Sequence, residues 1–429
     1  MISSTIIFIL LGVLLVCLVA GVPIAFSLGL AGAATIAAAS GVPFLVQIPL
    51  TLQRALADPV ILAVPMYILM GEILYRGKVG QQLFDVANAW IGRIRGGTGV
   101  SAVTAFTFFA AIVGSSMASV LTIGRIAIPE MQKAGYPKRL SHGLSVVGGS
   151  LGILIPPSIP LIIYASLASV SPAQLFLAGL LPGLLIAAML SVWAMLMAPR
   201  PKYAASSHWS GRAALRITLR ALPDLALPVV VLGGIYLGIY TPTEAAGIGV
   251  VLALLLTVVL RQSLSLRELP EVMITATRHS AGLLAIVVGA LVLGSALTLI
   301  GLPQFLAKQV MEAGVEPWIV LLIMNLVWII LGCFLEVISI ILITVPVFVP
   351  IAVALGFDPL WFGILMVINM ELAVITPPLG MNLFALKAIL PEERIETIIR
   401  AALPSLAIVL TVLALVWIFP DIALVLTRL

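Results

Sequence analysis

The chain has 429 residues, of which 62% are hydrophobic and only 9% are charged. A soluble domain carries about 25% charged residues, so the composition excludes a soluble protein and predicts an all-α polytopic membrane protein. The net charge of +5 is expected to reflect basic cytoplasmic loops and not a nucleic-acid interface.

Apolar runs of spanning length occur at ten places in chain order. They cover about 5–20, 22–39, 59–76, 141–168, 173–198, 223–240, 243–260, 279–300, 361–386 and 401–419. The first run is expected to be a retained helix, because no basic residue precedes it and no small-residue cleavage site follows. Cys17 and Cys333 both lie in apolar runs, which excludes a disulfide framework and disfavours a metal site of cysteine ligands.

Two further blocks, 97–131 and 317–350, are too long for one span and have polar or small residues at their centres. Each block could be an ordinary pair of short helices or a re-entrant helical hairpin. Basic residues flank the first block on both sides, whereas acidic residues flank the second. Because basic residues collect on the cytoplasmic side, this pattern favours two hairpins that enter from opposite faces, with both chain termini periplasmic.

Adjacent prolines interrupt two of the predicted spans, at Pro156-Pro157 and at Pro377-Pro378, about half the chain apart. Proline removes a backbone donor and clashes with the preceding turn, so each pair predicts a broken helix. Broken helices at matching positions of two halves are typical of secondary transporters, where they form the ion and substrate site. The pattern predicts two inverted repeats, each with a re-entrant hairpin and a proline-broken transmembrane helix.

The expected organisation follows from these repeats. It comprises N-terminal scaffold helices (1–58), a first repeat (59–198, hairpin 97–131, broken helix 141–168), a cytoplasmic amphipathic segment with scaffold helices (199–278), a second repeat (279–419, hairpin 317–350, broken helix 361–386) and a C-terminal tail (420–429). Within the third part, Arg212, Arg216 and Arg220 recur every four residues near Trp209. Residues 204–222 could therefore be an interfacial helix or a plain basic loop.

Polar residues at the hairpin centres and the helix breaks are the candidate site. Neutral hydroxyl and carbonyl oxygens suit a sodium ion, and the ends of half-helices add partial charges for an ion or a carboxylate. The first group is Gly114, Ser115, Ser116, Ser119, Pro156, Pro157 and Ser158; the second is Glu336, Ser339, Thr376, Pro377, Gly380, Met381 and Asn382. Alternatively, the serines only permit close helix packing, and Asn382 makes an interhelical hydrogen bond.

Ionisable residues inside the membrane are also candidates. Arg125 could pair with Glu130 or attract an anionic substrate, and Glu371 could couple transport to a proton or cation or belong to a buried structural pair. Three glutamates are expected in structural ion pairs near span ends, and two histidines are expected at the cytoplasmic surface: Glu72, Glu130 and Glu244, and His142 and His279. Zinc, phosphate-loop and nucleophile-elbow motifs are missing, so we expect no enzyme and no ATP hydrolysis.

The chain resembles the large membrane subunit of tripartite ATP-independent periplasmic (TRAP) transporters, the DctM-like M subunit, within the ion transporter superfamily. The similar segments run through most of the chain: 65–72 (PMYILMGE), 114–116 (GSS), 128–131 (IPEM) with 135–136 (GY), 155–158 (IPPS), 241–246 (TPTEAA) and 375–382 (ITPPLGMN). The resemblance implies sodium-driven uptake of organic acids at the bacterial inner membrane by an elevator-type transporter. It also implies two partners, a small four-helix membrane subunit and a periplasmic substrate-binding protein.

The resemblance places the sodium sites at Ser115, Ser116, Pro156, Ser158, Thr376, Pro377, Gly380 and Asn382. With the residues above, we expect sodium binding also at Ser119, Ser339 and Met381, and substrate binding at Ser116, Arg125, Pro157, Glu336 and Asn382. No cofactor other than the coupling ions is expected. The substrate would be a small organic acid such as a dicarboxylate, keto acid or sugar acid. Alternatives are a stand-alone symporter of the divalent-anion or citrate type, coupled to sodium or protons, and a non-transporting membrane scaffold.

Overall fold

The structure is a computed structural model that describes residues 4–199 and 211–428, and every regular element in these ranges is a helix. The N-terminal part contains α1 (Ser4–Val19), α2 (Ile24–Ser40), η1 (Val42–Val46) and α3 (Gln47–Ala57). Between the two halves lie α12 (Gly211–Tyr236), α13 (Pro242–Leu254) and η4 (Leu255–Leu260).

The two halves contain the same sequence of elements: a long helix, a short amphipathic helix, a helix pair, an interrupted helix and another long helix. The first half is α4 (Pro59–Arg76), α5 (Val79–Ile91), α6 (Gly97–Val113), α7 (Ser116–Ser119), η2 (Val120–Gly124), α8 (Arg125–Lys133), α9 (Lys138–Ser150), η3 (Leu151–Ile153), α10 (Ile159–Ala168) and α11 (Pro172–Met197). The second half is α14 (Leu269–Leu299), α15 (Leu302–Glu312), α16 (Pro317–Gly332), α17 (Val337–Ala354), α18 (Pro359–Ile375), α19 (Met381–Ile389) and α20 (Ile395–Ile418), followed by α21 (Asp421–Leu424) and η5 (Val425–Arg428).

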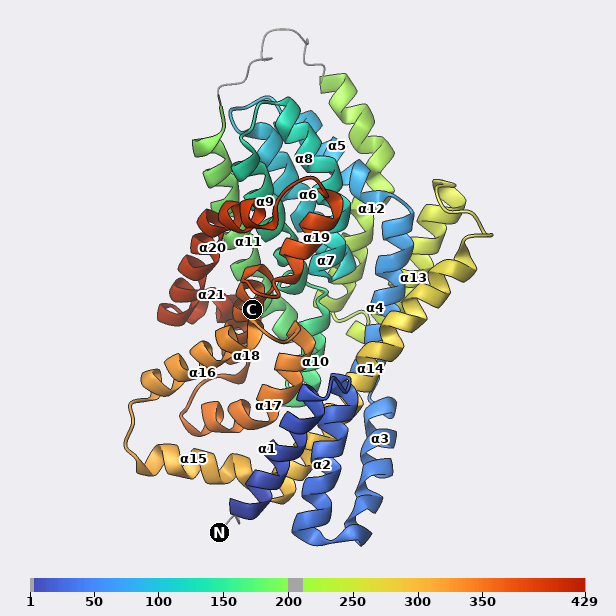
Figure 1. The fold of residues 1–429 in the computed structure, drawn as a ribbon. Coiled ribbons are helices and arrows are strands. Elements are labelled where there is room, and N and C mark those ends of the chain that lie inside the picture. The colour runs from blue at the N-terminus through green and yellow to red at the C-terminus, as the bar shows by residue number, and fades with distance from the viewer. Residues whose placement is uncertain (1–3, 200–210, 429) are drawn as a thin grey trace.

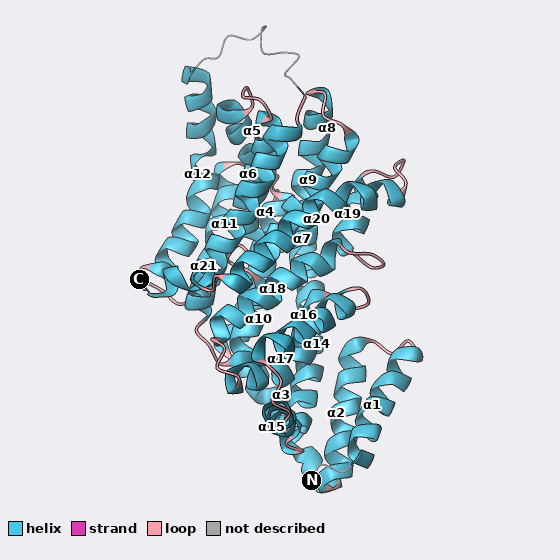
Figure 2. Ribbon diagram, turned by 90° about the vertical axis from the view of Figure 1, so that its left-hand side faces the viewer, coloured by secondary structure: helices cyan, strands magenta, loops and turns pink. Residues whose placement is uncertain are grey.

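The two helix pairs lie toward opposite ends of the molecule. Figure 1 shows α6, α7 and α8 in its upper half and α16 with α17 in its lower half. Figures 1 and 2 both place α7, α18 and α19 in the middle of the molecule. The turns of the two pairs therefore approach the interrupted helices from opposite directions.

The two interrupted helices pack antiparallel. The side-chain amide of Asn382 at the start of α19 donates to the carbonyl oxygen of Val146 in α9, at 3.0 Å. The hydroxyl of Tyr164 in α10 donates to the carbonyl oxygen of Pro359 at the start of α18, at 2.6 Å. Residue numbers rise along one interrupted helix while they fall along the other, so the two breaks lie in the same region of the molecule.

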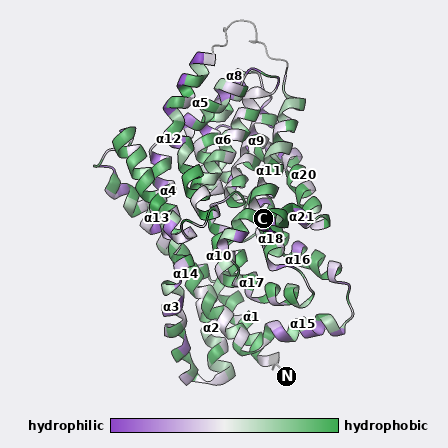
Figure 3. Ribbon diagram, turned by 180° about the vertical axis from the view of Figure 1, so that it is seen from behind, coloured by the Kyte–Doolittle hydropathy of each residue, from purple (hydrophilic) through white to green (hydrophobic). Residues whose placement is uncertain are grey.

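Six helices in the described ranges are long and apolar enough to cross a membrane: α4, α11, α13 with η4, α14, α17 and α20. Shorter apolar helices include α1, α2, α6, α10, α16 and α18. Figure 3 shows hydrophobic residues throughout the middle of the molecule and hydrophilic residues on α15, on α3 and at the start of α12. The chain is a multi-pass membrane protein.

Close packing of α2 against α14 fixes the N-terminal helices. A β-carbon on Gly289 of α14 would collide with the carbonyl oxygen of Ala25, and one on Gly32 of α2 would lie 2.8 Å from the backbone nitrogen of Leu293. Only glycine allows the two backbones to approach this closely, which is a common device at membrane helix crossings.

The structure corrects one sequence prediction and adds two elements. Residues 211–222, expected as part of an interfacial helix or a basic loop, are continuous with the following span in α12, despite Pro223 and Pro228 inside that helix. Residues 204–210, including Trp209, lie outside the described part of the chain. The sequence did not predict α5 and α15, because each is shorter and more polar than a membrane-spanning run. The segment expected as a C-terminal tail forms α21 and η5, which pack against α11.

Candidate transport site

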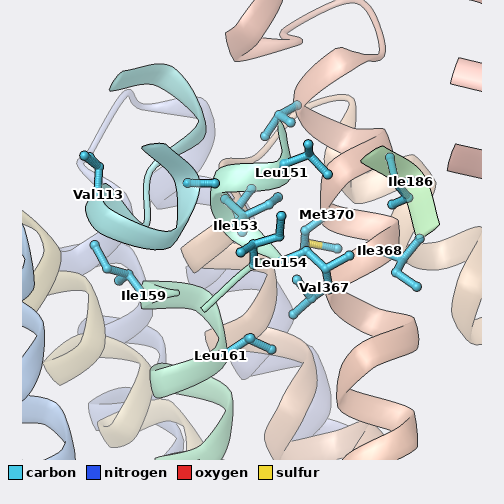
Figure 4. Packing of buried hydrophobic residues seen from close by; sticks show 14 of the residues in the cluster. Val113, Leu151, Ile153, Leu154, Ile159, Leu161, Ile186, Val367, Ile368 and Met370 are labelled. Carbon is cyan, nitrogen blue, oxygen red and sulfur yellow. The ribbon is translucent and has the colours of Figure 1, made fainter. Parts of the chain in front are cut away.

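The first helix break lies between η3 and α10 and is completely buried. Residues 154–158 are all buried, and the Pro156–Pro157 bond is cis. Ser158 begins α10: its hydroxyl donates to the carbonyl oxygen of Ile153 and accepts from the backbone nitrogen of Leu161 at 3.4 Å. Figure 4 shows Leu154 packed beside Val367 and Met370 of α18. The predicted break is confirmed, and protein, not lipid, surrounds it.

The turn of the first helix pair packs directly on this break. Gly114 has φ +63°, and a β-carbon there would lie 2.5 Å from the carbonyl oxygen of Pro157. Similarly, a β-carbon on Gly152 would lie 2.7 Å from the carbonyl oxygen of Ser115. The structure therefore brings together the hairpin turn and the proline break of the first predicted site, with several backbone carbonyls in one small region.

The hydroxyls of this site donate mainly to nearby carbonyls. Ser119 is fully buried and donates to the carbonyl oxygen of Ser115 at 2.8 Å. The hydroxyl of Ser115 caps α7 by accepting from the backbone nitrogen of Ala118 at 3.5 Å. Ser116 is 5% exposed. Since a hydroxyl that donates once still has lone pairs, these groups could contribute neutral oxygen ligands to a cation.

The second break differs from the first in its exposure. Thr376 donates to the carbonyl oxygen of Leu372 at 2.6 Å and ends α18, while Gly380, with φ +38°, begins α19. The Pro377–Pro378 bond is cis, and residues 377–379 are exposed. The second predicted break is therefore also confirmed, but it opens to the surface of this chain.

Asn382 contacts the first interrupted helix and not the second helix pair. Its amide nitrogen binds Val146, as described above, and its side-chain oxygen is buried without a hydrogen-bond partner. The predicted interhelical hydrogen bond is thus present. A buried amide oxygen without a partner is also a group that a hard cation could satisfy, because such ions prefer neutral or anionic oxygen ligands. Within the described residues, no cluster of three His, Cys, Asp or Glu side chains offers a site for a transition metal.

A cavity of about 440 Å³ lies where the two helix-pair turns meet α19. Its lining is apolar except for Glu336: Met117, Leu121, Leu335, Glu336, Leu379, Met381, Phe384, Ala385 and Ala388. Glu336 begins α17 and accepts from the hydroxyl of Ser339 at 3.4 Å. The cavity brings Glu336 and Met381 together with Met117, the neighbour of Ser116, whereas Pro157 and Arg125 are not among its lining residues.

Two of the glutamates near helix ends behave differently from each other. Glu72 binds Arg76 at 3.3 Å, which confirms its predicted ion pair. The ion pair predicted for Glu244 is wrong: its carboxylate completes a capping box with Thr241 at the start of α13. Glu130 pairs with Lys133 at 2.7 Å, so the predicted pair of Glu130 with Arg125 is wrong. Lys133 lies three residues along the same helix, within easier reach. Arg125 itself is exposed.

One of the two histidine predictions is wrong. His279 is exposed as expected, but His142 is 0% exposed, and neither ring nitrogen has a hydrogen-bond partner. The neighbouring Gly143 allows α20 to approach so closely that a β-carbon there would collide with the carbonyl oxygen of Ala401. This contact, made by residues far away in the sequence, covers His142.

The chain is similar in sequence to known proteins. The family described as "Tripartite ATP-independent periplasmic transporter, DctM component" matches residues 11–422. The chain belongs to this family. It is therefore a TRAP transporter component and not an enzyme.

Two relatives and one solved structure illustrate the range of similarity. The C4-dicarboxylate TRAP transporter large permease protein DctM of Pseudomonas aeruginosa is 41% identical over 401 residues, covering 93% of each chain. The isethionate TRAP transporter permease protein DctMQ of Oleidesulfovibrio alaskensis is 34% identical, covering 96% of this chain and 65% of the relative. The crystal structure of the Alcanivorax borkumensis YdaH transporter aligns with a TM-score of 0.61 at 18% identity, covering 89% of each chain, and indicates a shared fold.

Proposed function

We propose that this chain is the membrane subunit that moves a small organic acid into the cell, driven by a sodium gradient. It would act with a small four-helix membrane subunit and a periplasmic substrate-binding protein in the bacterial inner membrane. Membership of the DctM family supports the transport role. The name DctMQ and the greater length of the isethionate relative support a second membrane subunit.

One observation carries this proposal: the turn of the first helix pair lies directly on a buried proline break. Carbonyl oxygens of the turn and break converge there with serine hydroxyls, a neutral set suited to sodium. We assign a first ion site to Ser115, Ser116, Ser119, Pro156 and Ser158. By the repeated order of elements, a second site would use Ser339, Thr376, Pro377, Gly380, Met381 and Asn382.

The substrate would bind between the two helix-pair turns, in and beside the cavity lined by Glu336 and Met381. Candidate substrate residues are Ser116, Arg125, Pro157, Glu336 and Asn382. Because the lining contains no basic side chain, the carboxylate would need bound sodium and the positive ends of nearby half-helices as its counter-charge. Uptake should therefore depend steeply on sodium, since the ion helps to create the anion site.

The antiparallel packing of the interrupted helices supports an inverted-repeat architecture with re-entrant hairpins. In such a fold the hairpins and broken helices would move as one body against the remaining helices. We place the end with α5, α8 and the start of α12 in the cytoplasm, because basic residues collect on that side. Both termini would then be periplasmic.

Reconstitution in liposomes tests this function. The chain, its small membrane subunit and its binding protein are combined, and uptake of radiolabelled succinate, sialic acid, isethionate or ectoine is measured. A preceding thermal-shift screen of the binding protein selects the solute. Uptake should require an inward sodium gradient and all three proteins. Equal uptake with and without sodium would contradict the coupling, and uptake by the chain alone would favour the stand-alone symporter.

A further inference from the structure

Glu371 in α18 is an acidic residue that has neither an ion-pair partner nor a hydrogen-bond partner in the described part of the chain. It is 0% exposed, and neither carboxyl oxygen has a hydrogen-bond partner. It lies five residues before Thr376, at the end of α18 that leads into the second break. An ionised carboxylate in such surroundings is so unfavourable that the group takes up a proton instead.

The direction of this side chain follows from its neighbours along α18. Figure 4 places Val367 beside Leu154 of the first break and Ile368 on the side of Ile186 of α11. Glu371 lies one helical turn beyond both residues and so on the same face. On the opposite face of α18, the side-chain amide nitrogen of Asn369 donates to the side-chain oxygen of Asn325 in α16 at 2.6 Å. Glu371 therefore faces the first proline break.

No charged group near Glu371 could pair with it. The helices α11, α16 and α17 and the turn η3 pack against α18 and contain no titratable side chain within their bounds. Glu336, the residue before α17, is itself acidic and accepts a hydrogen bond from Ser339. The remaining neighbours, α9, α10, α19, α20 and α21, contain Lys138, Arg139, His142, Tyr164, Lys387, Glu396, Arg400 and Asp421. None of the charged residues in this set is buried.

The two buried members of that set are also accounted for. Tyr164 uses its hydroxyl on the carbonyl oxygen of Pro359. His142 lies one turn from Lys138 at the far end of α9, where Lys138 binds Glu393. The carboxyl group of Glu371 thus lies between two interrupted helices, in a region where the surrounding side chains offer neither charge nor hydrogen bond.

The second break lies close to Glu371 along the chain and is exposed at the surface of this chain. Residues 377–379 of the second break are exposed, six to eight residues after Glu371. A movement that separates the two breaks would open the Glu371 face to solvent, where its carboxyl group would ionise. Such a movement belongs to the proposed transport function, on which this inference rests.

We propose that Glu371 is a proton-binding site that holds its proton in the conformation described here and releases it when the breaks open to water. The transporter would then handle a proton in addition to its other ions. The proton leaves to water on one side and returns from water on the other, so no further reactant is needed.

Infrared spectroscopy of the complex in lipid nanodiscs tests this inference without any solute. With ¹³C-labelled glutamate, a protonated buried carboxyl group gives a carbonyl band that exposed, ionised glutamates lack at neutral pH. We expect this band in the wild type and its loss in Glu371→Gln, a neutral variant of similar shape. We also expect the band to convert to carboxylate as the pH is raised. Glu336→Gln, the matched control in the second helix pair, should retain it.

Two results would overturn the inference. A band that does not change as the pH is raised would make Glu371 a permanently neutral structural group, and absence of the band at neutral pH would mean that it is ionised. Because wild-type protein alone gives either result, poor folding of Glu371→Gln leaves the test intact. Sodium-driven uptake is measured separately, so failure of the proposed function remains distinguishable from failure of this inference.

Discussion

The side-chain amide of Asn382 donates a 3.0 Å hydrogen bond to the carbonyl oxygen of Val146, 236 residues earlier in the chain. This bond joins α9 of the first interrupted helix to the start of α19, two residues after Gly380 of the second break. The side-chain oxygen of Asn382 is buried and has no hydrogen-bond partner. Asn382 therefore links the two halves of the candidate site and leaves an oxygen free for an ion.

Asn382→Ala should weaken sodium binding more than it weakens the fold. Loss of one ligand and one buried hydrogen bond, worth about 1–3 kcal/mol, should raise the sodium concentration for half-maximal uptake about tenfold. The measurement is solute uptake against sodium concentration in liposomes. The control is Asn325→Ala, which removes a buried amide that bonds only within α16 and to Asn369. An equal sodium dependence in both variants would contradict the site.

Gly114→Ala should abolish most uptake. A left-handed backbone costs a residue other than glycine about 1–2 kcal/mol, and the new methyl group would lie 2.5 Å from the Pro157 oxygen. The hairpin turn must then move off the break. Gly233→Ala in α12 is the matched control, because no atom lies within 4 Å of its β-carbon position. If Gly114→Ala transported normally, the turn would not form part of the site.

Gly289→Ala should destabilise the packing of α2 on α14 by about 1–3 kcal/mol, because the added carbon meets backbone that cannot rotate away. Thermal unfolding of the purified protein measures this loss. Gly282→Ala lies on the same helix in open space and should be neutral or stabilising by up to about 1 kcal/mol. Similar melting temperatures for both variants would show that α2 and α14 cross less closely.

Asp224→Ala should reduce stability strongly. Asp224 is 1% exposed and pairs with Arg261, so its removal leaves a cation near buried surface, at a cost of about 3–5 kcal/mol. The control is Lys308→Ala, which breaks an exposed pair with Glu312 and should change stability by less than about 0.5 kcal/mol. Equal thermal shifts would mean that the Asp224 pair contributes no more than a surface pair.

Glu393 in the loop before α20 should make stability depend on acid pH. A hydrogen bond from Lys138 lowers the pKa of Glu393, and the positive charges of Lys138 and Lys387 act in the same direction. A carboxyl pKa that is lower in the folded state stabilises the protein above the unfolded pKa of about 4.3, and the effect disappears as the pH falls through the folded pKa. Melting curves of wild type and Glu393→Gln should therefore differ at neutral pH and converge in acid. A constant difference would contradict the assignment.

Local chemistry explains what the sequence could predict. Proline pairs break helices whatever surrounds them, so both interruptions, at 154–158 and 376–380, followed from the residues alone. The helix pairs also followed, because apolar blocks of that length with polar centres must turn. Hydroxyl and glycine residues at the first turn then marked the site that the structure assembles around Pro157.

Long-range packing explains what the sequence could not predict. His142 is buried because α20 approaches Gly143 closely. The hydrogen-bond partner of Asn382, the carbonyl oxygen of Val146, lies 236 residues earlier in the chain. Arginines at every fourth position suggested an interfacial helix or a basic loop for residues 204–222, yet α12 continues from residue 211 into the following span. The sequence of one segment does not show which distant segment will pack against it, so these features could be seen only in the folded structure.

The two proline breaks differ in one respect: the first is enclosed by protein, whereas the second has residues 377–379 at the surface of this chain. Any particle held at the enclosed break can depart only after its surroundings rearrange, while one held at the open break can exchange at once. Ions at the two breaks would thus bind and leave in a set order, while the ion gradient sets the direction of net transport.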